Sequence, residues 1–218
     1  MKNLASVLLI ILVCCICGCV SSSLPLTSNL NDFVIMGINT NSADTITYDY
    51  QSKIVDGGLR PFSKDKGPSR SGQKGYNQST SSTLGRMFKE YIENKFTRID
   101  NTSNLRIQLT LDDFWLEEYR SSSAGKEAFA AFFGGEVNYM CVAKMHATLT
   151  VQKDGEQTVK KLSASSEDTY IQGYGTGTQT SSYHRGTNSL QHVHARNINK
   201  INNKILMLIN NQLAELKL

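Results

Sequence analysis

The chain has 218 residues and a formal net charge of +4, and 39% of its residues are hydrophobic. This length suffices for one domain with its own core, and so mild a charge gives no reason to expect a nucleic-acid partner. Four of the five cysteines lie within the first nineteen residues, which leaves Cys141 alone in the rest of the chain. A disulfide framework within the folded part is therefore excluded.

The first nineteen residues are typical of a bacterial secretory signal. Lys2 provides a short positive start, and the apolar stretch that follows it is shorter than the roughly 20 residues of a transmembrane helix. Ile16-Cys17-Gly18-Cys19 resembles the lipobox of bacterial lipoproteins, because Cys19 follows a small residue and stands three positions after an aliphatic one. We predict a signal peptide at 1–18 and cleavage between Gly18 and Cys19. The alternatives are an ordinary signal peptide with incidental cysteines and an uncleaved N-terminal anchor.

Lipidation at this motif places a diacylglyceryl thioether and an N-acyl chain, such as palmitate, on Cys19. These chains exceed the two signals that stable membrane anchoring requires, and we expect no other cofactor. Val20 and Ser21 stand where an aspartate retains many lipoproteins in the inner membrane. We therefore expect a lipid-anchored protein of the outer membrane that faces the periplasm.

After a lipidated tether at 19–31, residues 32–218 are predicted to form a single domain. Phe33–Ile38 is an apolar run typical of a buried first strand, whereas 41–80 has the composition of a long flexible loop with one exposed strand at Thr45–Tyr50. The section 53–74 is basic and rich in glycine. It could contact anionic lipid headgroups or remain a solvated, disordered loop. The basic residues proposed for this contact are Lys64, Lys66, Arg70 and Lys74.

The second half of the domain alternates regularly enough to predict its elements. Apolar residues at three- and four-residue spacing from Leu84 predict a helix that ends near Arg98, with the N-cap hydroxyls at 81–83. Residues 105–116 alternate as a strand whose parity changes at Asp112-Asp113, so we expect a bulge there. Strands at 139–151 and 157–171 flank Asp154-Gly155, a strong hairpin signal, and a final amphipathic helix covers 188–216. The predicted fold is α+β, a two-layer sandwich in which two helices pack on one face of an antiparallel sheet of about four strands.

Side chains suited to chemistry do not form an enzymatic motif. His192 and His194 point about 200° apart on a helix, so we interpret them as solvated side chains and expect no metal site. The carboxylates at 112, 113, 117 and 118 are interpreted as a solvated acidic face or edge guard. Cys141 shares the parity of apolar residues and is interpreted as a buried structural cysteine. We expect no enzyme and no small-molecule substrate.

Ala128 to Phe133 is an apolar patch bounded by glycines. One interpretation is a short helix or loop that closes the end of the core. The other is an exposed wedge, with Phe129, Phe132 and Phe133 in contact with the membrane or a protein partner.

The order of lipobox, short strand, amphipathic helix, strand at 104–109, hairpin at 143–164 and C-terminal helix resembles the YajG-like bacterial lipoproteins. The Gly/Ala-rich apolar insertion before Glu136-Val137-Asn138-Tyr139 also makes the chain similar to the TraT-type surface-exclusion lipoproteins. The resemblance implies a lipoprotein without catalysis and transfers no site residue beyond the lipidated cysteine. We expect a binding or assembly accessory of the cell envelope with a protein partner; the alternative is a self-associating surface-exclusion or structural lipoprotein.

Overall fold

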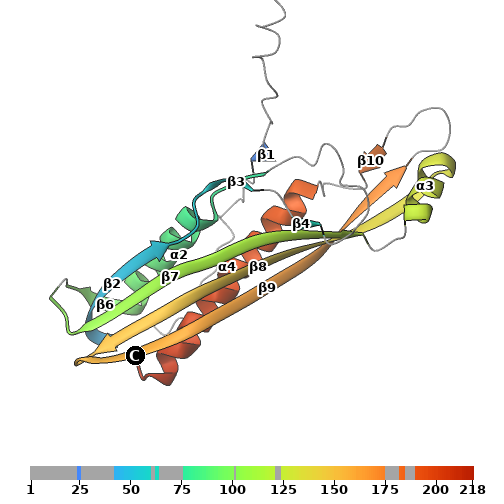
Figure 1. The fold of residues 1–218 in the computed structure, drawn as a ribbon. Coiled ribbons are helices and arrows are strands. Elements are labelled where there is room, and N and C mark those ends of the chain that lie inside the picture. Colours follow the sequence, from blue (N-terminus) through green and yellow to red (C-terminus); the bar gives the residue numbers. More distant parts are fainter. Residues whose placement is uncertain are drawn as a thin grey trace, which may run out of the picture.

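Figure 1 shows the computed structural model, which describes residues 24–25, 42–59, 62–63, 76–100, 102–120, 124–174, 182–184 and 190–218. The predicted signal peptide and the predicted first strand at Phe33–Ile38 lie outside the described residues. The same holds for Gly18 and Cys19, and for the basic side chains Lys64, Lys66, Arg70 and Lys74.

A mixed sheet forms the centre of the molecule. The long strands β7 (Leu105–Arg120), β8 (Gly135–Lys153) and β9 (Glu156–Tyr174) form an antiparallel ladder, and β2 (Ser42–Ser52) lies parallel to β7 and to β6 (Phe96–Ile99). Two short strands, β10 (Ser182–His184) and β4 (Phe62–Ser63), pair with β9 and β7. Within the described part of the chain the sheet has seven strands. The predicted α+β class is confirmed, but the purely antiparallel, four-stranded sheet is wrong.

The parallel pairing of β2 with β6 follows from the helix between them. Parallel neighbours need a long crossover connection, and α2 (Thr80–Lys95) lies in the connection from β2 to β6. The predicted helix end near Arg98 is wrong, because the chain leaves the helix at Lys95 and continues as β6. The ring of Phe96 is buried at that junction, so it packs into the same core as the apolar face of α2, although Phe96 belongs to a strand.

Two local predictions in the antiparallel ladder are confirmed. The β8–β9 hairpin closes through Asp154 and Gly155, whose φ angles of 50° and 88° are both positive, as a two-residue hairpin turn of type I′ requires. The register of β7 against β8 shifts between Leu111 and Asp113, which is the predicted bulge. Alternate residues on both sides of the bulge, including Leu109 and Leu116, therefore point into the core.

Helices α2 and α4 (Leu190–Glu215) cover one face of the sheet, as predicted (Figure 1). Their apolar stripes and the inward side chains of β7 and β8 form one continuous core. The hydroxyl of Tyr91 on α2 donates a hydrogen bond of 3.0 Å to the side-chain oxygen of Asn210 on α4. None of the helices in the described residues combines the length and the apolar character that crossing a bilayer requires.

The range 41–80, predicted as a long loop with one exposed strand at 45–50, contains β2, which covers that predicted strand, and also β3 (Gly57–Leu59), β4 and β5 (Tyr76–Gln78). The strand β1 (Leu24–Pro25) lies before this range and forms a small sheet with β5 and β3, in the order β1, β5, β3. The turn before β3 also caps α2, because the Asp56 carboxylate accepts hydrogen bonds from the backbone N–H groups of Ser81 and Ser82 at 2.8 and 3.0 Å. The cap is therefore the carboxylate of Asp56, 25 residues before Ser81, and not the predicted serine and threonine hydroxyls. Its negative charge is also favourable near the positive N-terminal end of the helix dipole.

The ladder extends beyond the two packed helices into an arm that carries α3 (Ala124–Phe133) at its tip (Figure 1). The arm has its own small core, which is separate from the main one. This core contains Ala130, Val137, Tyr139, Cys141, Tyr170 and Val193. The molecule is consequently elongated, with the β8–β9 turn at one end and α3 at the other.

Candidate functional site

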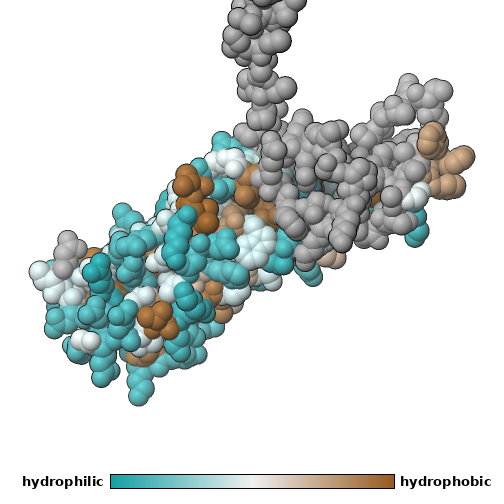
Figure 2. Space-filling model, in the orientation of Figure 1, coloured by the Kyte–Doolittle hydropathy of each residue, from teal (hydrophilic) through white to brown (hydrophobic). Residues whose placement is uncertain are grey.

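The tip of the arm exposes a cluster of aromatic rings. Phe129, Phe132 and Phe133 occupy positions i, i+3 and i+4 of α3 and are 63%, 80% and 65% exposed. The rings of Phe129 and Phe133 lie 4.6 Å apart between centroids. Figure 2 shows an apolar patch at the end of the molecule that carries α3, on a face whose other described surface is mostly hydrophilic. The structure thus brings the three predicted phenylalanines onto one exposed face, while what they contact stays a prediction.

The opposite side of α3 fixes the tip to the arm. Ala130 is buried, and a Cβ added at Gly135 would lie 3.2 Å from the Ala130 Cβ, so the helix approaches the start of β8 closely. Below this contact the rings of Tyr139 and Tyr170 pack at 6.0 Å. The exposed rings therefore belong to a helix that is packed against the arm, not to a free loop.

A polar group lies between the arm and the N-terminal half of α4. The ring Nε2 of His194 is 2.8 Å from an Oε1 of Glu118, and the His194 side chain is fully buried. The ring of Tyr76 packs on that of His194, with 5.0 Å between the ring centroids. The pKa of Tyr76 is raised, mainly by burial and in second place by the nearby Glu118 carboxylate. The interpretation of His194 as solvated is wrong, because its partner is 76 positions away in sequence. His192 is exposed, as expected.

Cys141 lies next to this group. Its thiol is buried and free, which confirms the structural interpretation, and burial raises its pKa, so the thiol is protonated and unreactive. The Asn197 side chain donates to the Cys141 carbonyl at 2.8 Å and accepts from the Ser166 hydroxyl at 3.0 Å. These bonds hold α4 against β8 and β9.

The face of the sheet away from the helices contains a second polar cluster, centred on Glu117. This carboxylate accepts hydrogen bonds from Trp115 at 2.9 Å, from Lys144 at 3.0 Å and from the Tyr119 hydroxyl. Burial alone would raise the pKa of Glu117, but the hydrogen bonds and the Lys144 charge outweigh it and lower the pKa to about 2. Glu117 is buried, so its interpretation as part of a solvated acidic face is wrong.

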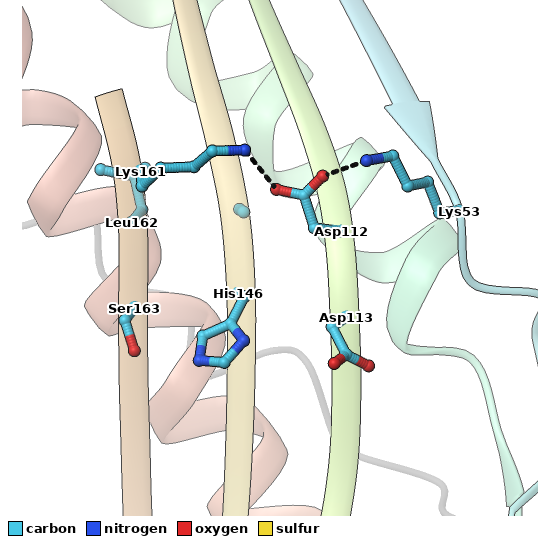
Figure 3. A pocket seen from close by; sticks show the side chains of 8 residues that line it. Lys53, Asp112, Asp113, His146, Lys161, Leu162 and Ser163 are labelled. Carbon is cyan, nitrogen blue, oxygen red and sulfur yellow. Dashed lines mark hydrogen bonds and ion pairs between the residues drawn. The ribbon is translucent and has the colours of Figure 1, made fainter. Parts of the chain in front are cut away.

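An open depression of about 480 Å³ lies beside the β7 bulge on the same face (Figure 3). Asp112 points into it between Lys53 at 2.6 Å and Lys161 at 3.9 Å, and it also accepts a hydrogen bond from Thr148. Burial opposes ionisation of Asp112, but hydrogen bonds from Lys53 and Thr148 lower its pKa overall. Both carboxylate oxygens are thus occupied, and the arrangement is a surface ion-pair network. Across the described residues, no group of three or more His, Cys, Asp or Glu side chains could hold a metal ion.

The outer edge of β9 is a third candidate surface. Among the described strands only β10 pairs with this edge, at residues 172–174, so no described strand pairs with the rest of it, from Glu156 to Ile171, which we call the open edge. Three basic side chains of α4 lie along it. Arg196 and Lys200 contact Asp168 at 3.0 and 3.3 Å, and Lys204 donates to the Ser165 carbonyl at 2.5 Å. Sequence reasoning found the strand but not its place at the edge, which depends on the order of strands in the sheet.

No family model and no curated protein matches the chain. Among solved structures it is similar to rare lipoprotein B from Shewanella oneidensis, with 13% identity, a TM-score of 0.41 and coverage of 78% of this chain and 99% of that one. A Xanthomonas campestris protein of the DUF330 family is 12% identical, with a TM-score of 0.38 and coverage of 88% and 96%. A minor lipoprotein from Acinetobacter baumannii is 8% identical, with a TM-score of 0.36 and coverage of 78% and 93%. These likenesses are of general architecture, two of them to proteins named as lipoproteins, and they do not single out the YajG-like or the TraT-type family.

Proposed function

We propose that the chain is a lipid-anchored protein of the bacterial outer membrane, facing the periplasm, that acts without catalysis as a binding or assembly accessory of the cell envelope. The lipobox ending at Cys19 supports the anchor. Fixing the domain at the membrane raises its effective concentration near other envelope proteins, so a modest binding surface suffices.

The observation that carries the binding role is the open edge of β9. A strand edge presents unpaired backbone N–H and C=O groups, and an extended segment of another protein can add to it as a further strand. The inward side chains of β9, including Leu162 and Ala164, are buried, so the strand is held firmly on the core. Such an edge is a preformed template for a partner.

The charges along the edge indicate the kind of segment that fits. The five basic residues along the edge, Lys160 and Lys161 on β9 and Arg196, Lys200 and Lys204 on α4, outnumber its three acidic residues, Glu156, Glu167 and Asp168. An extended segment that carries acidic side chains would gain attraction at this edge, whereas a basic one would be repelled. The same lysines also discourage indiscriminate pairing with neutral strands.

In-cell photocrosslinking of the full-length protein tests this proposal. A photoreactive residue at Ser163, at the centre of the open edge, should yield an adduct with one envelope protein, identified by mass spectrometry. Replacing both Lys160 and Lys161 by glutamate should reduce that adduct several-fold because it reverses the edge charge. Lys89→Glu on the exposed side of α2 is the matched control and should leave the adduct unchanged.

An adduct that forms equally in the charge-reversed variant would contradict edge recognition. Recovery of only the protein itself, from Ser163 or from Phe132, would instead favour the self-associating surface-exclusion or structural alternative.

A further inference from the structure

We propose that the aromatic face of α3 inserts into the bilayer interface and is a second membrane contact beside the lipid on Cys19. The inference rests on the proposed lipid anchor, and it assigns the exposed rings of Phe129, Phe132 and Phe133 to lipid rather than to protein. The lipid and the rings together would hold the elongated domain in one orientation at the membrane.

The tip has the geometry of an interfacial contact. Three exposed rings on one helical face are costly to leave in water, and no other element of the described chain covers them. The helix has ten residues and is about 15 Å long, too short to cross a bilayer of about 30 Å. An apolar helical face of this size instead lies about 5–10 Å deep, at the boundary of headgroups and acyl chains.

The position of the anchor brings the bilayer to this end of the molecule. Cys19 precedes Leu24 of β1 by five residues, which can span at most about 18 Å. Leu24 pairs with Tyr76, whose ring packs on His194 of α4. The neighbouring Val193 belongs to the same small core as Ala130 of α3. Strand pairing, ring packing and a shared small core thus connect β1 to the base of the tip, and both lie toward the N-terminal end of α4 (Figure 1).

Charge plays a minor part in this contact. Lys126 is exposed one turn before Phe129 on the same side of α3, where its stem can reach a headgroup phosphate. Glu127 follows it in sequence, so the helix is close to neutral. Insertion should therefore depend on the rings and be almost insensitive to salt, unlike binding by a basic patch.

Fluorescence quenching by brominated lipids tests the inference in the full-length protein reconstituted into phosphatidylethanolamine–phosphatidylglycerol vesicles. Phe132→Trp adds one tryptophan at the tip, and Val159→Trp, at an exposed site near the β8–β9 turn, is the matched control. The wild type, with Trp115 alone, supplies the background. Brominated acyl chains should remove about half of the emission added by Phe132→Trp, because the ring lies at acyl depth. They should leave the emission added by Val159→Trp unchanged, and the difference should persist in high salt.

Equal quenching of the two variants would overturn the inference. So would a blue shift of Phe132→Trp emission without quenching by bromine, which indicates that the rings are buried in a protein contact. The intact mass of the same reconstituted protein shows separately whether Cys19 carries lipid. Failure of the tip contact in a lipidated protein would therefore contradict this inference alone, whereas an unlipidated Cys19 would contradict the proposed anchor.

Discussion

At the scale of single residues, Glu117 and His194 are buried polar side chains with specific partners, one on each face of the sheet. On the face away from the helices, the Glu117 carboxylate accepts hydrogen bonds from Trp115, Tyr119 and Lys144. The pKa of Glu117 in the folded chain, about 2, lies below its ordinary value of 4.5. A carboxylate whose pKa is lowered by folding stabilises the fold above its unfolded pKa. It loses this contribution as the pH falls toward the folded pKa.

The cluster around Glu117 therefore predicts an acid-dependent stability. The free energy of unfolding should fall by up to about 3 kcal/mol as the pH drops from about 4.5 to about 2 through this residue. Glu117→Gln should lower stability at neutral pH by about 1–3 kcal/mol and flatten this part of the pH dependence. Urea unfolding followed by the fluorescence of the single tryptophan measures both effects. Glu156→Gln, exposed beside the hairpin turn, is the control and should match the wild type. A Glu117→Gln profile parallel to that of the wild type would contradict the assignment.

At the scale of elements, the close approach of α2 to β2 depends on one residue without a side chain. A Cβ added at Gly85 would lie 2.7 Å from two ring carbons of Tyr50. The Tyr50 hydroxyl donates to the Ser81 carbonyl at 2.8 Å, so the ring cannot swing away without losing that bond. The helix therefore crosses β2 at the position of Gly85.

Gly85→Ala should destabilise the protein by about 1–3 kcal/mol, although alanine is the better helix former. In a Tyr50→Ala background the same substitution should become neutral or stabilising by up to about 1 kcal/mol, because the clash is gone and the helix propensity remains. Gly125→Ala in α3, where an added Cβ meets nothing within 4 Å, is the matched control. Equal effects of Gly85→Ala in both backgrounds, measured by urea unfolding, would contradict this packing.

Elements with a strong local pattern could be predicted from the sequence. The alternation in β7, β8 and β9, the turn at Asp154-Gly155 and the parity change at Asp112-Asp113 all have local causes. The end of α2 could not be predicted, because Phe96 continues the helical spacing although the chain has become extended. The parallel pairing of β2 depends on strand order, which no local pattern contains.

The candidate sites divide in the same way. The phenylalanines of α3 stood out in sequence because three rings in five residues beside glycines are unusual, but only the structure shows them exposed. The partner of His194 could not be found, because Glu118 reaches it only after β7 and α4 are packed together. The open edge of β9 likewise exists only once the order of the strands is known.

At the scale of the whole molecule, the proposed surfaces lie apart and can act together. The aromatic tip and the start of the described chain lie toward the N-terminal end of α4, while the open edge of β9 runs back along the sheet toward the hairpin turn (Figure 1). A domain held at one end by lipid and rings would leave this edge free for a partner segment. This arrangement follows only if Cys19 is the mature N-terminus.

The most direct measurement is therefore tandem mass spectrometry of the N-terminal peptide of the protein purified from membranes. The account predicts a peptide that begins at Cys19 and carries a diacylglyceryl thioether and an N-acyl chain. A peptide that begins at Met1, or at any other residue without acyl chains, would contradict the anchor and the roles built on it.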